Sequence, residues 1–309
     1  MNEREVIARL RRIATDPAAR GLADDAALLD GLVITHDTIA EGVHFLRFDP
    51  PASVGWKLVA VNLSDLAAKG ATPRAALLSM SVGDVDWDEL FLGGIEAACE
   101  SYGLSLIGGD TIALPEGAPR VLGMTAIGLA GPRTPARSGG KPGDRLWLVG
   151  TLGDSAAGLA QLLGDPKATG PLVDHYRRPV PLLAAGHALT AHANASMDVS
   201  DGLLLDLSRL CAASGCGAEV DLGALPLSRA FVAERGQGRA ARLFAATGGD
   251  DYALLAAVPP EADALSLSLP SGTKIAPIGR LVKRHGIALS HGGKPVPLPA
   301  TLGFEHGGI

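Results

Sequence analysis

Apolar residues occur along the chain in short blocks separated by polar turns. Two runs, 26–29 and 32–35, flank an Asp-Gly pair and predict a β-hairpin. The mostly apolar stretch from Gly55 to Gly70 predicts a helix that a glycine closes. The opening residues predict an amphipathic helix that ends near Thr15. Further strands are expected at 75–82, 104–109 and 120–131, with a helix at 87–102.

The composition changes around residues 132–145, which are polar and rich in glycine and proline. Such a segment between apolar strands marks a domain boundary, so we expect domains at 1–140 and 141–309. The second half alternates again, with a proline-rich loop at 171–181. Its expected strands are 146–149, 195–199 and 218–222, and its expected helices are 155–163, 182–193 and 202–213. This order favours an α/β (α+β) protein.

Composition narrows the classes of function. Of the 309 residues 47% are hydrophobic and 4% aromatic, which suits two α/β domains better than a β-sandwich. The formal net charge is -6 and no Lys/Arg-rich run occurs, so nucleic acid is not an expected partner. Three cysteines without a CxxC pair suit a reducing compartment. No signal peptide or membrane span is evident, so we expect a cytoplasmic protein.

Several aspartates precede, follow or interrupt apolar runs, where a solvated surface would not place them. They are Asp24, Asp25, Asp37, Asp65, Asp110, Asp198, Asp201, Asp250 and Asp251. An aspartate inside an apolar helix, as Asp65 is, costs free energy unless it has a partner. Asp110 and Asp250 each follow Gly-Gly, which can turn sharply and present the next side chain at a strand end. Asp201 suits a helix N-cap and a metal ligand equally well.

Clustered carboxylates repel one another unless a cation lies between them. Magnesium prefers oxygen ligands, binds few protein carboxylates and completes its coordination with water and phosphate. Scattered single aspartates therefore fit a magnesium–nucleotide site. The P-loop pattern GxxxxGK[ST] is absent from the sequence.

Taken together, the motifs resemble a known family. In order they are DDAALL (24–29), THDTIAEGVHF (35–45), AVNLSDLAAKGATP (60–73), LIGGDT (106–111), RSGGKPGD (137–144), GTLGDSAAGL (150–159), MDVSDGLLLDL (197–207) and TGGDDYALL (247–255). This series is similar to bacterial thiamine-monophosphate kinase, from about residue 20 to the end. The resemblance implies transfer of the γ-phosphoryl group of ATP onto thiamine monophosphate, which gives thiamine diphosphate and ADP.

The resemblance also implies a fold and a site. The fold is that of the aminoimidazole-ribonucleotide synthetase (PurM-like) superfamily, a homodimer whose N-terminal mixed sheets pair into a β-barrel, with an α/β domain following. Magnesium ligands fall on Asp25, Asp37, Asp65, Asp110, Asp198 and Asp201, of which Asp65, Asp110 and Asp201 are the implied catalytic residues. ATP contacts fall on Thr35, Gly109, Arg137 and Ser200. Contacts to thiamine monophosphate fall on His44, Asp250 and Phe304.

Three positions depart from the family pattern. Ala23 stands where the family commonly has glycine, and His36 stands where it has threonine. Asp250 replaces the usual glutamate of a GGED motif with a shorter side chain.

Other functions remain open at this stage. One alternative is another ATP-dependent synthetase of the same superfamily. The selenophosphate enzymes are expected to carry a reactive cysteine near the N-terminus, whereas the first cysteine here is Cys99. A metal-dependent phosphohydrolase would use the aspartates to activate water. A non-catalytic nucleotide-binding subunit is disfavoured because all six implied metal ligands are present.

Overall fold

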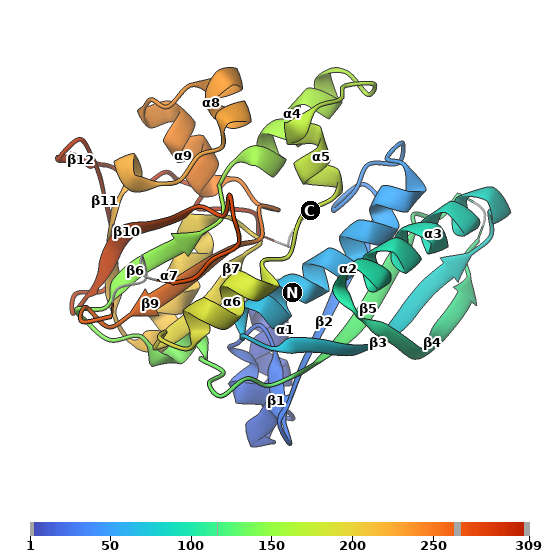
Figure 1. The fold of residues 1–309 in the computed structure, drawn as a ribbon, viewed down its shortest axis with the longest axis horizontal. Coiled ribbons are helices and arrows are strands. Elements are labelled where there is room, and N and C mark those ends of the chain that lie inside the picture. Colours follow the sequence, from blue (N-terminus) through green and yellow to red (C-terminus); the bar gives the residue numbers. More distant parts are fainter. Residues whose placement is uncertain (1–2, 116, 263–266, 306–309) are drawn as a thin grey trace.

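The computed structural model describes residues 3–115, 117–262 and 267–305. The chain builds two mixed β-sheets, each with its own helices (Figure 1). In the first sheet, β3 (Thr72–Val82) and β4 (Ser105–Ala113) pair in parallel. In the second sheet, β8 (Gly217–Asp221) and β11 (Gly286–His291) pair in parallel. All other neighbouring strands of the two sheets pair antiparallel. No helix within these ranges is long and apolar enough to cross a membrane.

The first sheet is covered by helices on one face. Its strand order is β1 (Ala27–Leu29), β2 (Leu32–Ala40), β5 (Val121–Leu129), β3 (Thr72–Val82) and β4 (Ser105–Ala113). Helices α2 (Pro51–Ala68) and α3 (Val85–Tyr102) pack side by side against it (Figure 1). The two helices approach closely because glycines face the contact: a Cβ on Gly55 would lie 2.2 Å from the carbonyl oxygen of Phe91. This close packing fixes the position of α2, which supplies Asp65 to the cavity.

The second sheet is buried on both faces at three neighbouring strands, β6 (Arg145–Val149), β9 (Ala253–Val258) and β7 (Ala195–Val199). Its strand order is β12 (Lys294–Val296), β11 (Gly286–His291), β8 (Gly217–Asp221), β10 (Ile275–Val282), β6 (Arg145–Val149), β9 (Ala253–Val258) and β7 (Ala195–Val199). Alternate residues of β6 point to opposite faces. Leu146 and Leu148 join the core beneath α7 (Leu203–Ser214), whereas Trp147 and Val149 pack with α6 (Leu183–Thr190) and the end of α2.

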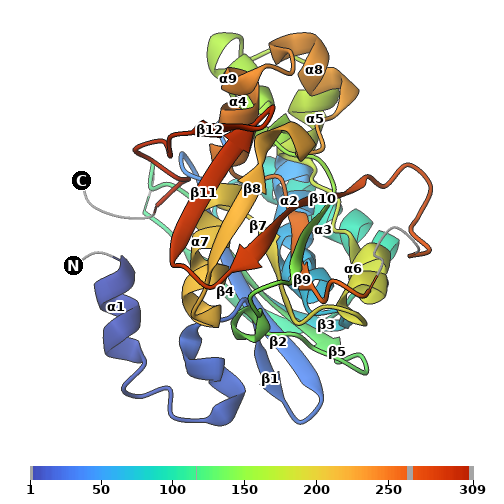
Figure 2. The same ribbon diagram turned by 90° about the vertical axis from the view of Figure 1, so that its left-hand side faces the viewer.

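Four further helices lie beyond one end of the second sheet (Figure 2). They are α4 (Asp154–Gly164), α5 (Pro171–Arg177), α8 (Arg229–Arg235) and α9 (Arg239–Thr247). Helix α1 (Glu3–Leu10) stands apart near the N-terminus, and short 3-10 helices span Pro17–Leu22, Arg137–Gly139 and Leu222–Ala224. Two expectations from the sequence were wrong here. The first helix ends at Leu10 rather than near Thr15, and the proline-rich loop contains α5, since proline is well tolerated in a first helical turn.

The two Gly-Gly-Asp segments do not form the turns that we predicted. Gly108, Gly109 and Asp110 all lie inside β4, and a Cβ on Gly109 would meet the carbonyl oxygen of Leu78 at 1.9 Å. Glycine is needed there for close packing of strands rather than for a turn. The second segment follows helix α9, and the positive φ values fall on Asp250 (67°) and Tyr252 (52°) instead of on the glycines.

Candidate active site

A cavity of about 1350 Å³ contains most of the residues that the sequence singled out. Its walls come from both sheets and their helices, including β2, α2 and the segment between β7 and α7. The predicted site residues that line it are Asp25, Asp37, His44, Asp65, Arg137, Asp198, Ser200, Asp201, Asp250 and Phe304. Residues up to 279 positions apart in sequence therefore meet in one space.

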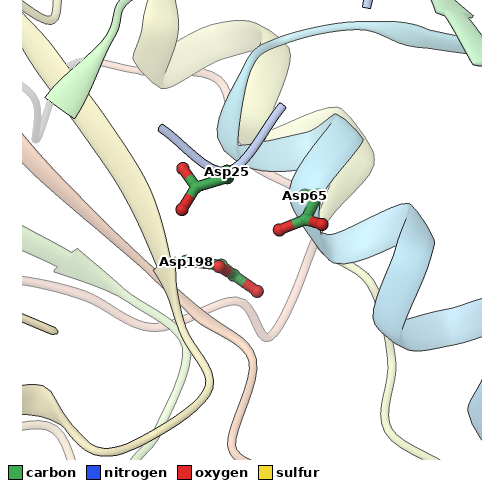
Figure 3. A group of neighbouring side chains, drawn as sticks. All are labelled: Asp25, Asp65 and Asp198. Atoms are coloured by element: carbon green, nitrogen blue, oxygen red, sulfur yellow. The ribbon is translucent and has the colours of Figure 1, made fainter. Parts of the chain in front are cut away.

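Three of the aspartates that line the cavity converge. Asp25 lies in the loop before β1, Asp65 on α2 and Asp198 on β7. Each offers a carboxylate oxygen, and these oxygens all lie within 4.8 Å of one another (Figure 3). Oxygen ligands this close suit a hard divalent cation such as magnesium.

Helix α2 organises this cluster through three polar residues in one turn, Asn62, Ser64 and Asp65. The Ser64 hydroxyl donates a hydrogen bond of 2.7 Å to Oδ2 of Asp198. Asp65 accepts one from the hydroxyl of the buried Thr35, on β2. Asn62 accepts from the backbone N–H of Asp37 at 3.0 Å. Because each of these buried polar groups has a partner, the apolar helix tolerates them.

The aspartates destabilise one another's charged forms. Burial, followed by repulsion from neighbouring carboxylates, raises the pKa of Asp65 and that of Asp198 well above the ordinary value. Burial and the charges of Asp25 and Asp201 raise the pKa of Asp37 to about 6. Asp37 lies inside β2 and not after its end, as we had expected. A carboxylate cluster with raised pKa values is short of positive charge, which a bound cation would supply.

Asp25 differs from Asp65 and Asp198 because two cations contact it. Burial alone would raise the pKa of Asp25, but the charges of Lys69 and Arg137 and their hydrogen bonds outweigh burial and lower it. Nζ of Lys69 lies 2.5 Å from Oδ2 of Asp25 and the same distance from Oδ1 of Asp24. Lys69 is fully buried and also donates to the carbonyl oxygen of Ser196 on β7. It therefore ties the loop before β1 to the second sheet.

Asp201 does not cap the helix that follows it. The N-cap of α7 is Gly202, without a side-chain hydrogen bond. The Asp201 carboxylate instead pairs with Arg209 at 2.5 Å, and its backbone N–H donates to Oδ2 of the buried Asp206. Burial and the charge of Asp201 raise the pKa of Asp206 to about 7. Of the two sequence interpretations of Asp201, the cap is wrong, and its carboxylate lines the cavity.

The residues expected to contact thiamine monophosphate all lie on the cavity wall. Nδ1 of His44 accepts a hydrogen bond of 3.1 Å from the backbone N–H of Ala40. The backbone N–H of Phe304 donates to the carbonyl oxygen of Asp201. Asp250 accepts from Lys57 at 2.8 Å.

Gly109 and Asp110 lie outside the cavity lining. Strand pairing places Asp37, Met124, Leu78 and Gly109 in one row across four neighbouring strands. Three inter-strand steps separate the backbones of Asp37 and Gly109 by roughly 14 Å. Asp110, the next residue, is exposed on β4, so the single chain does not bring it to the other aspartates.

His36, a departure from the family pattern, points away from the site. Along β2, Thr35 is buried while His36 is exposed, because successive side chains face opposite sides of a strand. The His36 ring contacts the hydroxyls of Thr125 and Thr38.

The sequence analysis missed the buried cations. Lys57, Val61 and Asp65 recur at four-residue spacing on α2, and Lys69 follows the last residue of the helix. The signal that could have found them is that Lys57 and Lys69 lie at multiples of this spacing from Asp65, on a mostly apolar helix where a charged side chain needs a partner. Tyr252 and Arg209, which contact Asp250 and Asp201, gave no comparable signal.

Comparison with known proteins decides the family. Residues 23–130 match the N-terminal domain of AIR synthase related proteins, and residues 141–292 match the C-terminal domain. The thiamine-monophosphate kinase of Caulobacter vibrioides is 41% identical over 97% of this chain and 90% of its own length. The chain belongs to the thiamine-monophosphate kinase family.

Solved structures agree with this membership of the thiamine-monophosphate kinase family. The structure described as AaThiL complexed with AMPPCP and TMP has a TM-score of 0.85 and 31% identity, covering 99% of this chain and 97% of its own. Thiamine-monophosphate kinase from Stenotrophomonas maltophilia has a TM-score of 0.73 and 36% identity, covering 94% and 96%.

Several expectations are thereby confirmed. They are the family, the two-domain α/β PurM-like fold with two mixed sheets, and the activity of an ATP-dependent thiamine-phosphate kinase. ATP is the co-substrate, and the product is thiamine diphosphate.

Proposed function

We propose that the chain catalyses direct in-line transfer of the γ-phosphoryl group from ATP to the phosphate of thiamine monophosphate, with magnesium ions held by the aspartates. The observation that carries the proposal is the convergence of Asp25, Asp65 and Asp198 in the large cavity. Both substrates are anionic, so the principal task of the site is to bring two phosphates together.

The residues present fit magnesium. The donor atoms are oxygens, and one carboxylate oxygen each of Asp25, Asp65 and Asp198 lies within 4.8 Å of the other two. Burial and mutual repulsion raise the pKa of Asp65 and that of Asp198. The residues of this chain that would hold the ions are Asp25, Asp37, Asp65, Asp198 and Asp201. Bound magnesium neutralises phosphate charge and aligns the reacting groups. Thr35 and Ser64 hold Asp65 and Asp198 in place by hydrogen bonds.

Nucleotide and acceptor bind different parts of the wall in this proposal. Arg137 brings positive charge to the rim of the aspartate cluster, and Ser200 lies between Asp198 and Asp201. Thr35 acts through Asp65, since its hydroxyl is committed there. The acceptor is received by His44, Asp250 and Phe304.

The transfer needs no covalent enzyme intermediate. The acceptor phosphate is ionised at neutral pH, so no side chain has to remove a proton from it. The contribution of the protein is positioning and charge compensation.

We also propose a homodimer that completes the site. Residues 1–140 form the ATP- and magnesium-binding and dimerisation domain, and residues 141–309 complete the nucleotide and acceptor site. Strand β4 is exposed throughout and carries Leu106, Ile107 and Ile112 at an edge of the first sheet. Apolar residues at a sheet edge favour pairing with a second copy. Pairing of two such sheets into a barrel would deliver the partner subunit's Gly109 and Asp110 to this chain's cavity.

The decisive experiment incubates the purified protein with ATP, magnesium and thiamine monophosphate and quantifies the products. We expect thiamine diphosphate and ADP in equal amounts, with both lost when a chelator is added. Phosphate released from thiamine monophosphate without ATP would favour a phosphohydrolase and overturn the proposal. If products still formed after complete chelation, the proposed role of magnesium would be overturned, but the phosphoryl transfer itself would not.

A further inference from the structure

Lys57 is a buried lysine that lies behind the cavity wall. Its side chain is 2% exposed, and it extends from α2. Nζ donates to Oδ2 of Asp250 and to the carbonyl oxygen of His44, both at 2.8 Å, and lies 4.2 Å from the ring centroid of Tyr176. A buried ammonium group is costly unless it is compensated, and here a carboxylate, a carbonyl group and an aromatic face do so.

The three partners of Lys57 share one property. His44, Tyr176 and Asp250 all line the cavity, whereas Lys57 is not part of its lining. They come from the loop after β2, from α5 and from the loop before β9. One ammonium group therefore joins three separate segments of the wall at a single point.

The carboxylate of Asp250 is fixed at both oxygens. Lys57 binds Oδ2, and the hydroxyl of Tyr252 donates to Oδ1 at 3.0 Å. The backbone of both Asp250 and Tyr252 is in the left-handed region, which is uncommon for residues other than glycine. Their N–H groups donate to the carbonyl oxygens of Ser200 and Val199. A side chain tethered in this way presents its charge in one orientation.

Lys57 lies away from the nucleotide side of the site. It precedes Asp65 by eight residues on α2, a distance of roughly 12 Å along the helix axis. The cations at the aspartate cluster are Lys69 and Arg137. Loss of Lys57 should therefore disturb the acceptor wall selectively.

We propose that Lys57 is a positioning residue for the acceptor substrate. It holds Asp250, His44 and Tyr176 in the arrangement that receives thiamine monophosphate, without touching the substrate itself. The inference rests on the proposed acceptor role of His44 and Asp250. Lys57 and Tyr252 together fix the carboxylate of Asp250, whose side chain is shorter than the glutamate that the family has at this position.

The test is steady-state kinetics of K57M in the full-length enzyme, with each substrate varied in turn. Methionine keeps an unbranched side chain, one atom shorter than that of lysine, and removes the charge. We expect the KM for thiamine monophosphate to rise about 10- to 100-fold, as misplaced binding groups commonly cause, while the KM for ATP stays within about 2-fold of wild type. K274M is the control for loss of a lysine charge outside the cavity lining, because the side chain of Lys274 donates only to the carbonyl oxygen of Leu227, among the hydrogen bonds of the described residues.

A second variant covers the case in which K57M fails to fold. Y252F retains the buried ring and removes the other tether of Asp250. It should raise the KM for thiamine monophosphate in the same selective way, by about 3- to 10-fold. Unchanged KM values in both variants, or equal increases for both substrates, would overturn the positioning role. Failure of the wild-type enzyme to form thiamine diphosphate would instead overturn the proposed function, so the two failures are distinguishable.

Discussion

Nε of Arg137 lies 2.8 Å from Oδ1 of Asp25, and a second nitrogen of the same guanidinium group binds the same oxygen. Arg137 belongs to the segment between the two sheets, and Asp25 to the loop before the first sheet. The pair places a cation against one of the three converging carboxylates. Arg137 therefore compensates part of the negative charge of the aspartate cluster.

Replacing Arg137 by methionine should weaken use of ATP. We expect R137M to lose at least about 10-fold in kcat/KM for ATP, because hydrogen bonds to charged groups contribute about 1.5–3 kcal/mol. Without magnesium its melting temperature should also fall, since Asp25 loses a partner. Kinetics and calorimetry check this. R133M is the control, because Arg133 is exposed and donates to the carbonyl oxygen of Ala191. An unaltered kcat/KM for ATP in R137M would remove Arg137 from the ATP site.

Replacing Asp65 by asparagine should abolish turnover while leaving the fold intact. Loss of a magnesium ligand removes several kcal/mol of transition-state stabilisation, or about 1000-fold in rate. The magnesium-free melting temperature should not fall, because the raised pKa of Asp65 already favours its neutral form. The rise in melting temperature that magnesium produces should be lost. D86N, an exposed aspartate of α3, is the control. Near-normal turnover of D65N would contradict the metal assignment.

The magnesium-free protein should lose stability as the pH rises. The pKa of Asp37 is about 6 and that of Asp206 about 7, both above the value of about 3.9 in an unfolded chain. Between these values the folded state binds more protons than the unfolded state, so stability falls from about pH 4 to about pH 7. Calorimetry at about pH 5 and pH 8 measures the difference.

Magnesium should reverse this trend, since its ligands must be deprotonated and its affinity therefore rises with pH. The variant D37N should show a weaker pH dependence without metal. A magnesium-free melting temperature that rises across the same range would show that the aspartates do not control stability.

A mixture of two inactive variants should recover activity if Asp110 serves the partner's site. In a mixed dimer of D110N and D65N, one site holds an intact Asp65 and the partner subunit's intact Asp110. After subunit exchange, about a quarter of wild-type activity should return, because half of the dimers are mixed and each has one intact site. Recovery is measured after mild denaturation and refolding of the mixture. No recovery, with exchange verified, would place Asp110 outside the partner's site.

The dimer itself can be tested at β4. I107E puts a charge at a position that is 63% exposed in the single chain, and it should yield monomers in light scattering. L163E alters an equally exposed leucine of α4 and should leave the oligomeric state unchanged. An I107E dimer as stable as wild type would contradict pairing through this edge.

The local pattern of the sequence predicted most elements of the fold, because the spacing of apolar residues distinguishes helices from strands and glycines often mark their ends. Strand β7 has the predicted bounds, and α2 differs mainly by an earlier start. The errors arose where local signals have two meanings. Gly108-Gly109 was taken for a turn, yet close contact between β3 and β4 also requires glycine at position 109.

The sequence by itself indicated the family and the activity, through the resemblance of its motifs, and it singled out the aspartates by their positions at the ends and in the middle of apolar runs. Only the tertiary structure decided which of them meet. It brought Asp25, Asp65 and Asp198 together from three segments, and it left Asp110 on an exposed strand. It also showed the buried cations Lys57 and Lys69, whose partners lie far away in sequence. Charge compensation between distant segments depends on distances in space, and a linear pattern carries no record of them.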